Sequence, residues 1–429
     1  MRTVLILAYY FPPIGLGGTQ RPLKFVKYLP SLGWRPIVVT VKDVHYYGRD
    51  TSLLSEIPAE AVVERTGSLD PLRLAHLFGR RGQRLSDADA KTNTLLKGLL
   101  FPDNQVGWIP FAVLRALKII RRERVDALFT TFPPASGHLA GYLLHHLTGL
   151  PWITDFRDVW TGGEFDQYPT VLHRTMANAL QRAIVGTADR LIAVTSDIAD
   201  SLTALGAEPS RLSVVPNGYD PADFAHLAPA PRDHRFLLVY SGTMNAARNP
   251  EPLFRAIRLL LDRRPALESH FTVRLVGAAI GLDLPDQIRR FRLETVVGLI
   301  GYLPHRDALA QLLAADALVL LLTTEASLAR GVPTGKSYEY LASGKPVLGV
   351  APPGAAGDLL ARTHRGKAIA PEDTAGIADA LEALITDWQT KTRHSFSVED
   401  DSVKPYSRLT LTQQLAEILD DVTTKPRNQ

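Results

Sequence analysis

The residue types best suited to binding a phosphorylated ligand gather in residues 331–347. Glycine, proline, lysine and glutamate meet here, where a loop is expected to turn into a short helix. The backbone N–H groups of Thr334 and Gly335 would lie at the helix N-terminus, which attracts anions, and Lys336 adds a full positive charge. Glu339 follows one turn later and could accept hydrogen bonds from a ribose diol. Alternatively, Lys336 and Glu339 form an ordinary solvated pair on a helix surface.

A second basic segment, residues 241–250, follows an expected strand at 236–240. Its Arg248 guanidinium could bind a phosphate through two hydrogen bonds and offset the charge of a leaving group. Gly242 belongs to the same loop, and both residues are candidates for ligand binding. The alternative is an exposed arginine at a helix start. Tyr302 follows another expected strand and either lies near a nucleotide base or packs internally.

A glycine-rich loop at residues 15–18 follows the first expected strand. Gly17 and Gly18 carry no side chains that would block the approach of a diphosphate or an acceptor. The segment lacks the third glycine of a GxGxxG dinucleotide fingerprint, so a tight strand-to-helix turn is an equally good interpretation. Arg21 is expected on the first turn of the next helix, facing a cleft.

Polar residues also follow an expected strand at 152–155. Asp155 and Asp158 flank Arg157, and Trp160 follows, a combination that suits a sugar-binding edge. The alternative is an ion pair that fixes the loop. The two carboxylates are three residues apart with a cation between them, so no metal site is expected. His138 is expected near a helix start, where a surface position is favoured over contact with an acceptor.

Short β-branched segments alternate with helical patterns, which predicts parallel sheets covered by helices on both faces. Helices are expected at 21–32, 111–124 and 407–419, with a helical insertion in 44–105. The expected strands of the first half span residues 3–8, 36–41, 127–131, 152–155 and 191–194. Those of the second half span residues 236–240, 272–276, 296–300, 317–322 and 346–350.

The alternation pauses near 216–232, where a hinge is expected, and then restarts. In doubly wound sheets, ligands bind beyond the carboxyl ends of the strands. We therefore expect an α/β fold of two doubly wound Rossmann-like domains facing an interdomain cleft. The expected parts are an N-terminal domain at 1–220, a C-terminal domain at 232–400, and a C-terminal helix and tail at 401–429 that packs back on the N-terminal domain.

Several motifs in this order resemble family-4-like retaining glycosyltransferases. "PTGKSYEYLASGKPVLG" resembles their donor-binding signature, and "GYLPHRDALAQLLAADALVLL" resembles the segment before it. "YYFPPIGLGGTQR" resembles their N-terminal glycine loop, and "VVPNGYD" their interdomain linker. "PWITDFRDVW" resembles a motif of the bacterial surface-polysaccharide branch. The resemblance implies the glycosyltransferase-B (GT-B) fold, a nucleotide-sugar donor, retention of anomeric configuration, and no cofactor or metal.

The resemblance also distributes the candidate residues between donor and acceptor. The catalytic candidates are Arg248, Lys336, Asp155 and Asp158. The donor-binding candidates are Gly17, Gly18, Gly242, Tyr302, Thr334, Gly335 and Glu339, and the acceptor-side candidates are Arg21, His138 and Arg157. In the front-face mechanism that the resemblance implies, no protein nucleophile is needed, because the departing phosphate assists the incoming hydroxyl.

Two positions depart from the family pattern. Many members carry a glutamate eight positions before the one that matches Glu339, and this chain has Gly331 there. Glu325 is nearby but out of register, so backbone amides at 331–334 are expected to hold the donor sugar hydroxyls. Thr243 replaces an expected arginine. These departures leave a non-catalytic nucleotide-sugar-binding homologue open. A nucleotide-sugar epimerase of the same fold is a second alternative, although the sequence shows no convincing set of acid–base carboxylates for it.

Composition limits the remaining classes. The chain of 429 residues has no cysteine, which excludes a disulfide scaffold, a cysteine-ligated metal site and a thiol nucleophile. No apolar run reaches the roughly 18 residues of a membrane span, so a cytoplasmic protein is expected. Residues 1–150 carry 19 basic and 11 acidic residues, although no nucleic-acid recognition motif accompanies them.

That excess of positive charge leaves a peripheral contact with the inner face of the cell membrane open. The segment 71–124 mixes apolar residues such as Leu74, Phe101 and Trp108 with basic residues that include Arg80, Arg81 and Arg84. Such a mixture suits the headgroup layer of an anionic membrane. The same residues could instead form an internal helical cap. The expected partners are thus a nucleotide-sugar donor, a glycan or lipid-diphosphate-linked acceptor, and an anionic membrane surface.

Overall fold

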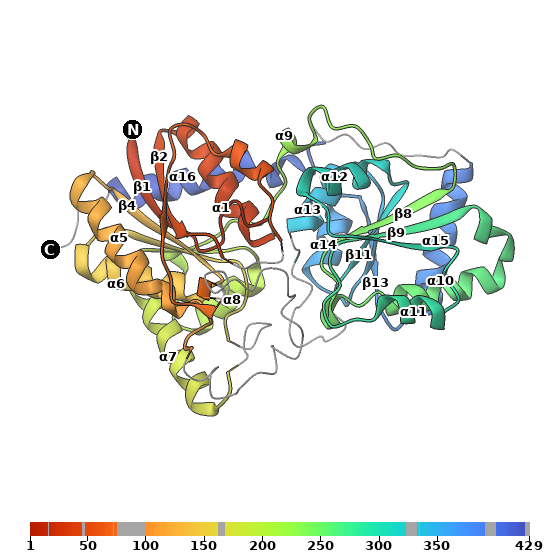
Figure 1. Cartoon of the computed structure of the whole chain (residues 1–429), viewed down its shortest axis with the longest axis horizontal. Coiled ribbons are helices and arrows are strands. Elements are labelled where there is room, and N and C mark those ends of the chain that lie inside the picture. Colours follow the sequence, from red (N-terminus) through yellow and green to blue (C-terminus); the bar gives the residue numbers. More distant parts are fainter. Residues whose placement is uncertain are drawn as a thin grey trace. The chain divides into compact units, whose positions relative to one another are not determined.

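The computed structural model describes residues 1–15, 17–44, 48–71, 73–74, 100–161, 168–322, 333, 335–390 and 400–424. The chain divides into two compact units (Figure 1). Unit 1 comprises residues 1–216 and 408–429, and unit 2 comprises residues 217–407. The chain therefore leaves unit 1 after residue 216, forms unit 2 and returns to unit 1 at residue 408. Each unit has a parallel sheet with helices packed against it.

Unit 1 contains a seven-stranded sheet whose central strands are buried on both faces, as parallel strands between helices require. The order is β3-β2-β1-β4-β5-β6-β7, and all the pairings are parallel. It reverses between β1 and β4, which is the topological switch point where such sheets bind ligands. The strands are β1 Arg2–Leu7, β2 Trp34–Val41, β3 Val62–Thr66, β4 Ala127–Phe132, β5 Trp152–Phe156, β6 Arg190–Ala193 and β7 Leu212–Val214.

The helices of unit 1 cover the sheet through apolar faces. They are α1 Gly17–Tyr28, α5 Ile109–Arg122, α6 Ala135–Thr148, α7 Val171–Thr187, α8 Ser196–Ala204 and α16 Arg408–Thr424. Helix α16 lies beside α1 although almost 400 residues separate them in the sequence (Figure 1). Its Leu411, Leu415 and Leu419 repeat every four residues and are buried in the same core as Val4 and Phe25. The last helix of the chain therefore completes the first sheet's core.

Unit 2 repeats the architecture with a six-stranded parallel sheet in the order β10-β9-β8-β11-β12-β13. The strands are β8 Phe236–Ser241, β9 Phe271–Val276, β10 Val297–Gly301, β11 Ala317–Leu321, β12 Val347–Val350 and β13 Gly366–Ile369. The helices are α9 Pro221–Phe224, α10 Glu251–Arg263, α11 Leu284–Arg290, α12 His305–Ala314, α13 Gly335–Ala342, α14 Ala355–Arg362 and α15 Thr374–Gln389. The order reverses between β8 and β11, so the loop after β8 lies at the switch point.

The predicted fold class, two doubly wound Rossmann-like domains, is confirmed. Each strand expected from the sequence is present, with boundaries shifted by one or two residues. Sequence analysis missed β3, β7 and β13, which are short and lie at sheet edges. Within the expected helical insertion at 44–105, β3 is a strand, and residues 75–99 lie outside the described part of the chain. Among the described helices, none is both long and apolar enough to cross a bilayer.

Candidate functional site

In unit 2, the loop after β8 and the first turns of α13 are held together by one buried tyrosine. The Tyr340 hydroxyl accepts a hydrogen bond from the Ser241 N–H at 2.7 Å and donates to the Ser241 carbonyl at 3.2 Å. Tyr340 lies on the second turn of α13 and Ser241 ends β8, so this pair ties the helix to the strand end. The sequence-predicted residues at 242–248 and 335–339 are thereby placed at the same edge of the sheet.

Two glycines let the loops after β8 and β9 approach each other. A Cβ on Gly277 would lie 1.9 Å from the Gly242 carbonyl oxygen, and Gly277 has a φ of +134°. A Cβ on Gly242 would lie 2.5 Å from the Tyr240 hydroxyl, which donates to the Thr243 carbonyl at 3.1 Å. Burial raises the pKa of Tyr240 to about 12, so the phenol stays protonated and keeps this role. Gly242 therefore shapes the loop by its lack of a side chain.

Arg248 and Lys336 place two positive charges in one neighbourhood. Asn245 caps the short 3-10 turn Ala246–Arg248 by accepting hydrogen bonds from the N–H groups of Ala247 and Arg248 at 3.0 and 3.1 Å. Burial lowers the pKa of the Lys336 ammonium, Glu339 raises it, and the charge of Arg248 lowers it further. Glu339 offsets only part of the cost of burying the Lys336 cation beside Arg248, so an additional anion would stabilise that cation and the arrangement suits a phosphate-bearing ligand.

Glu339 is oriented by His305, a residue that the sequence analysis did not select. His305 Nε2 lies 3.0 Å from Glu339 Oε1, and both side chains are largely buried. His305 begins α12 directly after the β10 loop, within the motif "GYLPHRD", and that position after a strand was the signal available in the sequence. Tyr302 lies in the same loop and is 36% exposed, so it has surface available to a ligand.

The predicted anion-binding helix start is observed only in part. Helix α13 begins at Gly335, so Gly335 and Lys336 form its first turn as expected. Thr334, Gly331 and Glu325 lie outside the described residues. The structure therefore brings together Gly242, Arg248, Gly335, Lys336 and Glu339 in unit 2.

In unit 1, Arg21 forms a buried ion pair with Asp155 instead of facing a cleft. Arg21 Nη2 lies 2.8 Å from Asp155 Oδ1, and both side chains are essentially inaccessible to solvent. Thr131 donates a further hydrogen bond to Asp155 Oδ2 at 2.8 Å. Arg21 also donates to the Pro216 and Val215 carbonyls at 2.6 and 2.9 Å. Both charges are satisfied within unit 1, so the expectation that Arg21 faces a cleft was wrong, because its side chain points from α1 toward Asp155 and the carbonyls of residues 215–216.

Arg157 is likewise buried, and it cross-links backbone segments. It donates to the carbonyls of Phe132, Pro133 and Gly18 at 3.0, 2.8 and 2.6 Å. Burial lowers the pKa of Arg157, while Asp155 and Asp158 raise it. Asp158 is partly exposed and lies at the end of β5 beside this guanidinium.

The predicted helix start at Arg21 was also displaced. Helix α1 begins at Gly17, so the expected glycine loop is partly the first turn of the helix. Gly18 holds the helix start against the end of β4 through Arg157. The hydrogen bond from Arg157 to the Gly18 carbonyl explains why the chain turns tightly from strand to helix here, and this explanation requires no ligand.

His138 is buried, although a surface position was favoured. Its Nδ1 lies 2.7 Å from Thr130 Oγ1, and its ring packs edge-on against Phe156 with centroids 4.6 Å apart. Burial lowers the pKa of His138 to about 3, so the imidazole is neutral at physiological pH. Nε2 has no hydrogen-bond partner among the residues that the structure describes. The surface expectation was wrong because α6 turns this residue toward the sheet.

Comparisons with known proteins match this architecture along most of the chain. A glycosyl transferase 4-like domain model matches residues 17–218, and a glycosyl transferases group 1 model matches residues 235–387. Glycogen synthase of Mycobacterium tuberculosis is 26% identical over 394 residues, covering 90% of this chain and 86% of that protein. D-inositol 3-phosphate glycosyltransferase of Actinosynnema mirum is 34% identical over 156 residues, covering 33% of this chain and 37% of that protein.

Solved structures share the fold. Anabaena HepE in complex with UDP and glucose has a TM-score of 0.67 at 17% identity, covering 98% of this chain and all of that one. WaaG, a glycosyltransferase involved in lipopolysaccharide biosynthesis, has a TM-score of 0.62 at 15% identity, covering 97% of this chain and 99% of that one. Two Rossmann-like domains with these neighbours define the glycosyltransferase-B fold. The chain belongs to the family-4-like glycosyltransferases of this fold and is an enzyme that transfers a sugar.

Proposed function

We propose that the chain is a retaining, metal-independent glycosyltransferase that moves a sugar from a nucleotide-sugar donor to a glycan or lipid-linked acceptor. The observation that carries the donor assignment is the charge cluster of Arg248 and Lys336 next to Glu339. HepE, whose structure contains UDP and glucose, has the same fold. WaaG, which shares the fold, is involved in lipopolysaccharide biosynthesis, and a cytoplasmic role in surface-polysaccharide biosynthesis is part of this proposal.

In this proposal, Arg248 and Lys336 bind the donor diphosphate, and Glu339, oriented by His305, accepts hydrogen bonds from the ribose. When the bond from the anomeric carbon to the phosphate oxygen breaks, the two cations offset the charge that develops on the diphosphate. The acceptor hydroxyl oxygen bonds to the anomeric carbon on the same face, and its proton passes to the departing phosphate. Most of the catalysis is then orientation and charge stabilisation.

The two predicted carboxylates of unit 1 receive different roles. Asp155 is occupied by Arg21 and Thr131, so we assign it to positioning the strand end and not to contact with the substrate. Asp158 is partly exposed and remains the candidate for binding acceptor hydroxyls. Arg157 and Arg21 support this edge from inside the protein.

Peripheral contact with an anionic membrane is proposed for the exposed face of α5. Leu114 is 69% exposed and Phe111 is 36% exposed, and Lys118, Arg121 and Arg122 continue the exposed surface toward the end of the helix. An apolar stretch beside cations suits the headgroup layer. Trp108, which the sequence analysis included in the membrane segment, is buried and donates to Thr66 Oγ1 at 2.8 Å. Arg80, Arg81 and Arg84 lie outside the described residues.

The proposal is tested with radiolabelled UDP-, GDP- and dTDP-sugars and a lipid extract as acceptor. Transfer with retained configuration at the new anomeric centre, read from its proton coupling constant, is expected with one of the donors. The Lys336→Ala variant should lose most of this transfer. Recovery of an isomerised free donor would favour an epimerase, and donor binding with no transfer would favour a non-catalytic homologue.

A further inference from the structure

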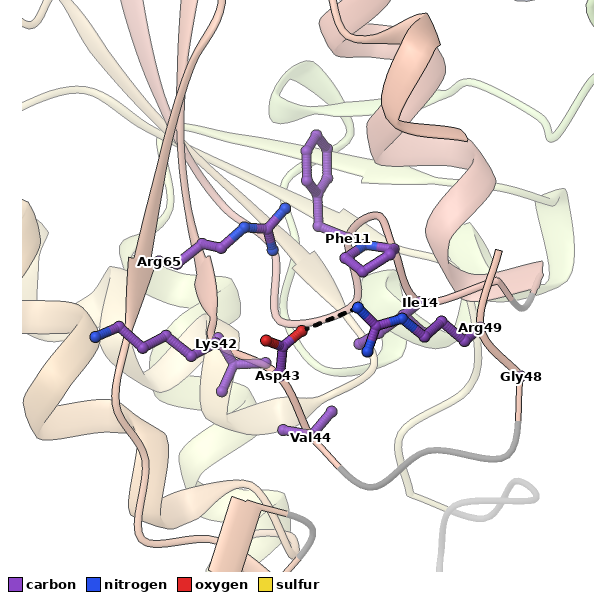
Figure 2. A pocket seen from close by; sticks show the side chains of 10 residues that line it. Phe11, Ile14, Lys42, Asp43, Val44, Gly48, Arg49 and Arg65 are labelled. Atoms are coloured by element: carbon purple, nitrogen blue, oxygen red, sulfur yellow. Dashed lines mark ion pairs between the residues drawn. The ribbon is translucent and has the colours of Figure 1, made fainter. Parts of the chain in front are cut away.

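A hollow lies at the carboxyl ends of β1, β2 and β3 in unit 1 (Figure 2). Its lining comes from the turn after β1, the end of β2, residues 48–49 and one side chain of β3, namely Phe11, Pro13, Ile14, Val41, Lys42, Asp43, Val44, Gly48, Arg49 and Arg65. Backbone pairing fixes part of the wall, because the Gly15 N–H donates to the Gly48 carbonyl at 3.0 Å and the Asp50 N–H to the Pro13 carbonyl at 2.9 Å. Ligands of doubly wound sheets bind at this edge.

The hollow carries three basic side chains and one acidic side chain. Arg49 Nη2 lies 3.5 Å from Asp43 Oδ1, and more than half of each side chain is exposed. Figure 2 shows Arg49 turned toward Asp43, while Lys42 extends away from that pair. An exposed ion pair of this kind is worth little, so Arg49 can exchange its partner at small cost. One carboxylate therefore leaves about two positive charges uncompensated.

Arg65 supplies the fixed cation of the hollow. Its Nη2 donates to the Pro12 carbonyl at 2.6 Å, which uses one of the five donors of the guanidinium. Burial lowers the pKa of Arg65, Asp43 raises it, and Arg49 lowers it. A partly buried guanidinium next to a second arginine gains from an anion that contacts both. The apolar side chains of Phe11 and Ile14 bound the same hollow and limit the access of water.

We propose that this hollow binds a phosphoryl group of the sugar acceptor through Arg65 and Arg49, with Lys42 at the rim. A phosphate monoester carries a charge of roughly −1.5 to −2 at neutral pH, which matches the uncompensated charge. The assignment of the phosphoryl group to an acceptor rests on the proposed function, whereas anion binding itself does not. The phosphoryl group could belong to a water-soluble sugar phosphate or to a lipid-linked sugar diphosphate.

Binding is measured by isothermal titration with glucose 6-phosphate at constant ionic strength, with glucose as the neutral control. The host is the full chain carrying Arg248→Ala and Lys336→Ala, so that the cations of unit 2 do not contribute. Arg65→Gln and Arg49→Gln should each weaken glucose 6-phosphate binding by about tenfold or more, as expected for a lost charged hydrogen bond. Asp43→Asn should strengthen binding, because it removes the competing carboxylate.

The matched control is Arg124→Gln, which removes one positive charge from a side chain that is 93% exposed. Arg124 lies just before β4, at the amino-terminal ends of the strands, whereas the hollow lies at their carboxyl ends. This substitution should leave the affinity unchanged. Equal losses in Arg124→Gln and Arg65→Gln, or no gain in Asp43→Asn, would overturn the site. Circular dichroism of each variant separates lost binding from misfolding, and Asp43→Asn is an exposed substitution that decides the question even if Arg65→Gln fails to fold.

Two further binding measurements distinguish the possible sources of the phosphoryl group. A polyprenyl diphosphate sugar in detergent micelles should bind more tightly than glucose 6-phosphate if the acceptor is lipid-linked, and the Arg49→Gln and Arg65→Gln substitutions should remove that difference. Tighter binding of the soluble phosphate would identify a water-soluble acceptor. Transfer activity is assayed separately in the unsubstituted protein. If glucose 6-phosphate binding depends on Arg49, Arg65 and Asp43 but the unsubstituted protein shows no transfer, the anion site stands and the proposed function is rejected.

Discussion

His305 Nε2 lies 3.0 Å from Glu339 Oε1, so the carboxylate proposed to bind the donor ribose has a fixed orientation before any ligand arrives. Glu339→Ala should weaken donor binding by about 1.5–3 kcal/mol, the cost of losing hydrogen bonds to a charged group. His305→Ala should have a smaller effect that appears mainly in KM, because Glu339 remains but is no longer held. Steady-state kinetics measure both, and a His305→Ala enzyme with an unchanged KM would remove this positioning role.

Arg248→Ala and Lys336→Ala should each weaken donor binding and transfer by about 1.5–3 kcal/mol without unfolding the protein. The physical reason is the loss of one charged contact to the donor phosphates. Titration calorimetry with the donor gives the affinity, and a thermal melt gives the stability. Unchanged affinity in both variants would exclude these residues from the donor site.

Donor affinity should also depend on pH in the alkaline range. Lys336 must be protonated to bind the diphosphate, and burial holds its pKa below that of an ordinary lysine. A bound anion raises that pKa again, so affinity is full below the lowered pKa and falls as the pH rises through it. The Lys336→Ala variant should lack this fall, and an identical pH profile in both proteins would contradict the assignment.

Asp155→Asn and Arg21→Met should each destabilise unit 1 by about 3–5 kcal/mol, because each leaves the other charge buried and unpaired. Urea unfolding followed by tryptophan fluorescence measures this effect. Four of the five tryptophans belong to unit 1, which makes the signal specific: Trp34, Trp108, Trp152 and Trp160. Donor binding in the folded variants should be unchanged. An Asp155→Asn protein of normal stability with no transfer would instead restore the sequence-based assignment of Asp155 as a catalytic residue.

Transfer activity should survive thorough treatment with EDTA. Asp155 is paired with Arg21 and Glu339 with His305, so the charge on the leaving diphosphate is expected to be balanced by Arg248 and Lys336 and not by a metal ion. The assay compares initial rates before and after chelation. Complete loss of activity that manganese or magnesium restores would overturn the metal-independent mechanism.

Liposome flotation tests the exposed face of α5. The protein should float with anionic vesicles at low salt and be released as salt increases, because screening weakens the attraction. Replacement of Lys118, Arg121 and Arg122 by glutamine should weaken flotation. The same replacement at three exposed arginines of unit 2, Arg263, Arg264 and Arg289, serves as the control for net charge. Equal losses in the two triple variants would indicate nonspecific attraction.

Much of the architecture could be predicted because buried parallel strands are continuous apolar runs. The segments around Val4, Phe129 and Leu238 are such runs, and each is a central strand. The edge strand β3 mixes valines with Glu64 and Arg65, so its sequence lacks that signal. The short edge strands β7 and β13 also lack a continuous apolar run.

The grouping of the donor-side candidates in space was predictable for a related reason, whereas their binding of a donor stays a prediction. Arg248, Lys336 and Glu339 follow strands that end at one sheet edge, so the predicted topology alone placed them together. The unit 1 candidates required knowledge of which way their side chains point. Arg21 and Asp155 are 134 residues apart in the sequence, so the expectation that Arg21 faces a cleft was made without knowledge of its partner. A charged side chain in a sequence has no visible partner, so local pattern alone cannot distinguish a substrate contact from an internal ion pair.

The return of the chain to unit 1 through α16 affects the order of folding during synthesis. Domains usually fold as they leave the ribosome, with N-terminal domains first. Here Leu411, Leu415 and Leu419 complete the core that contains Val4 and Phe25, yet they are translated after all of unit 2. One apolar face of the first sheet therefore stays partly uncovered while the ribosome synthesises unit 2. A nascent chain that stops before residue 408 would expose this surface, and it would depend on chaperones to avoid aggregation.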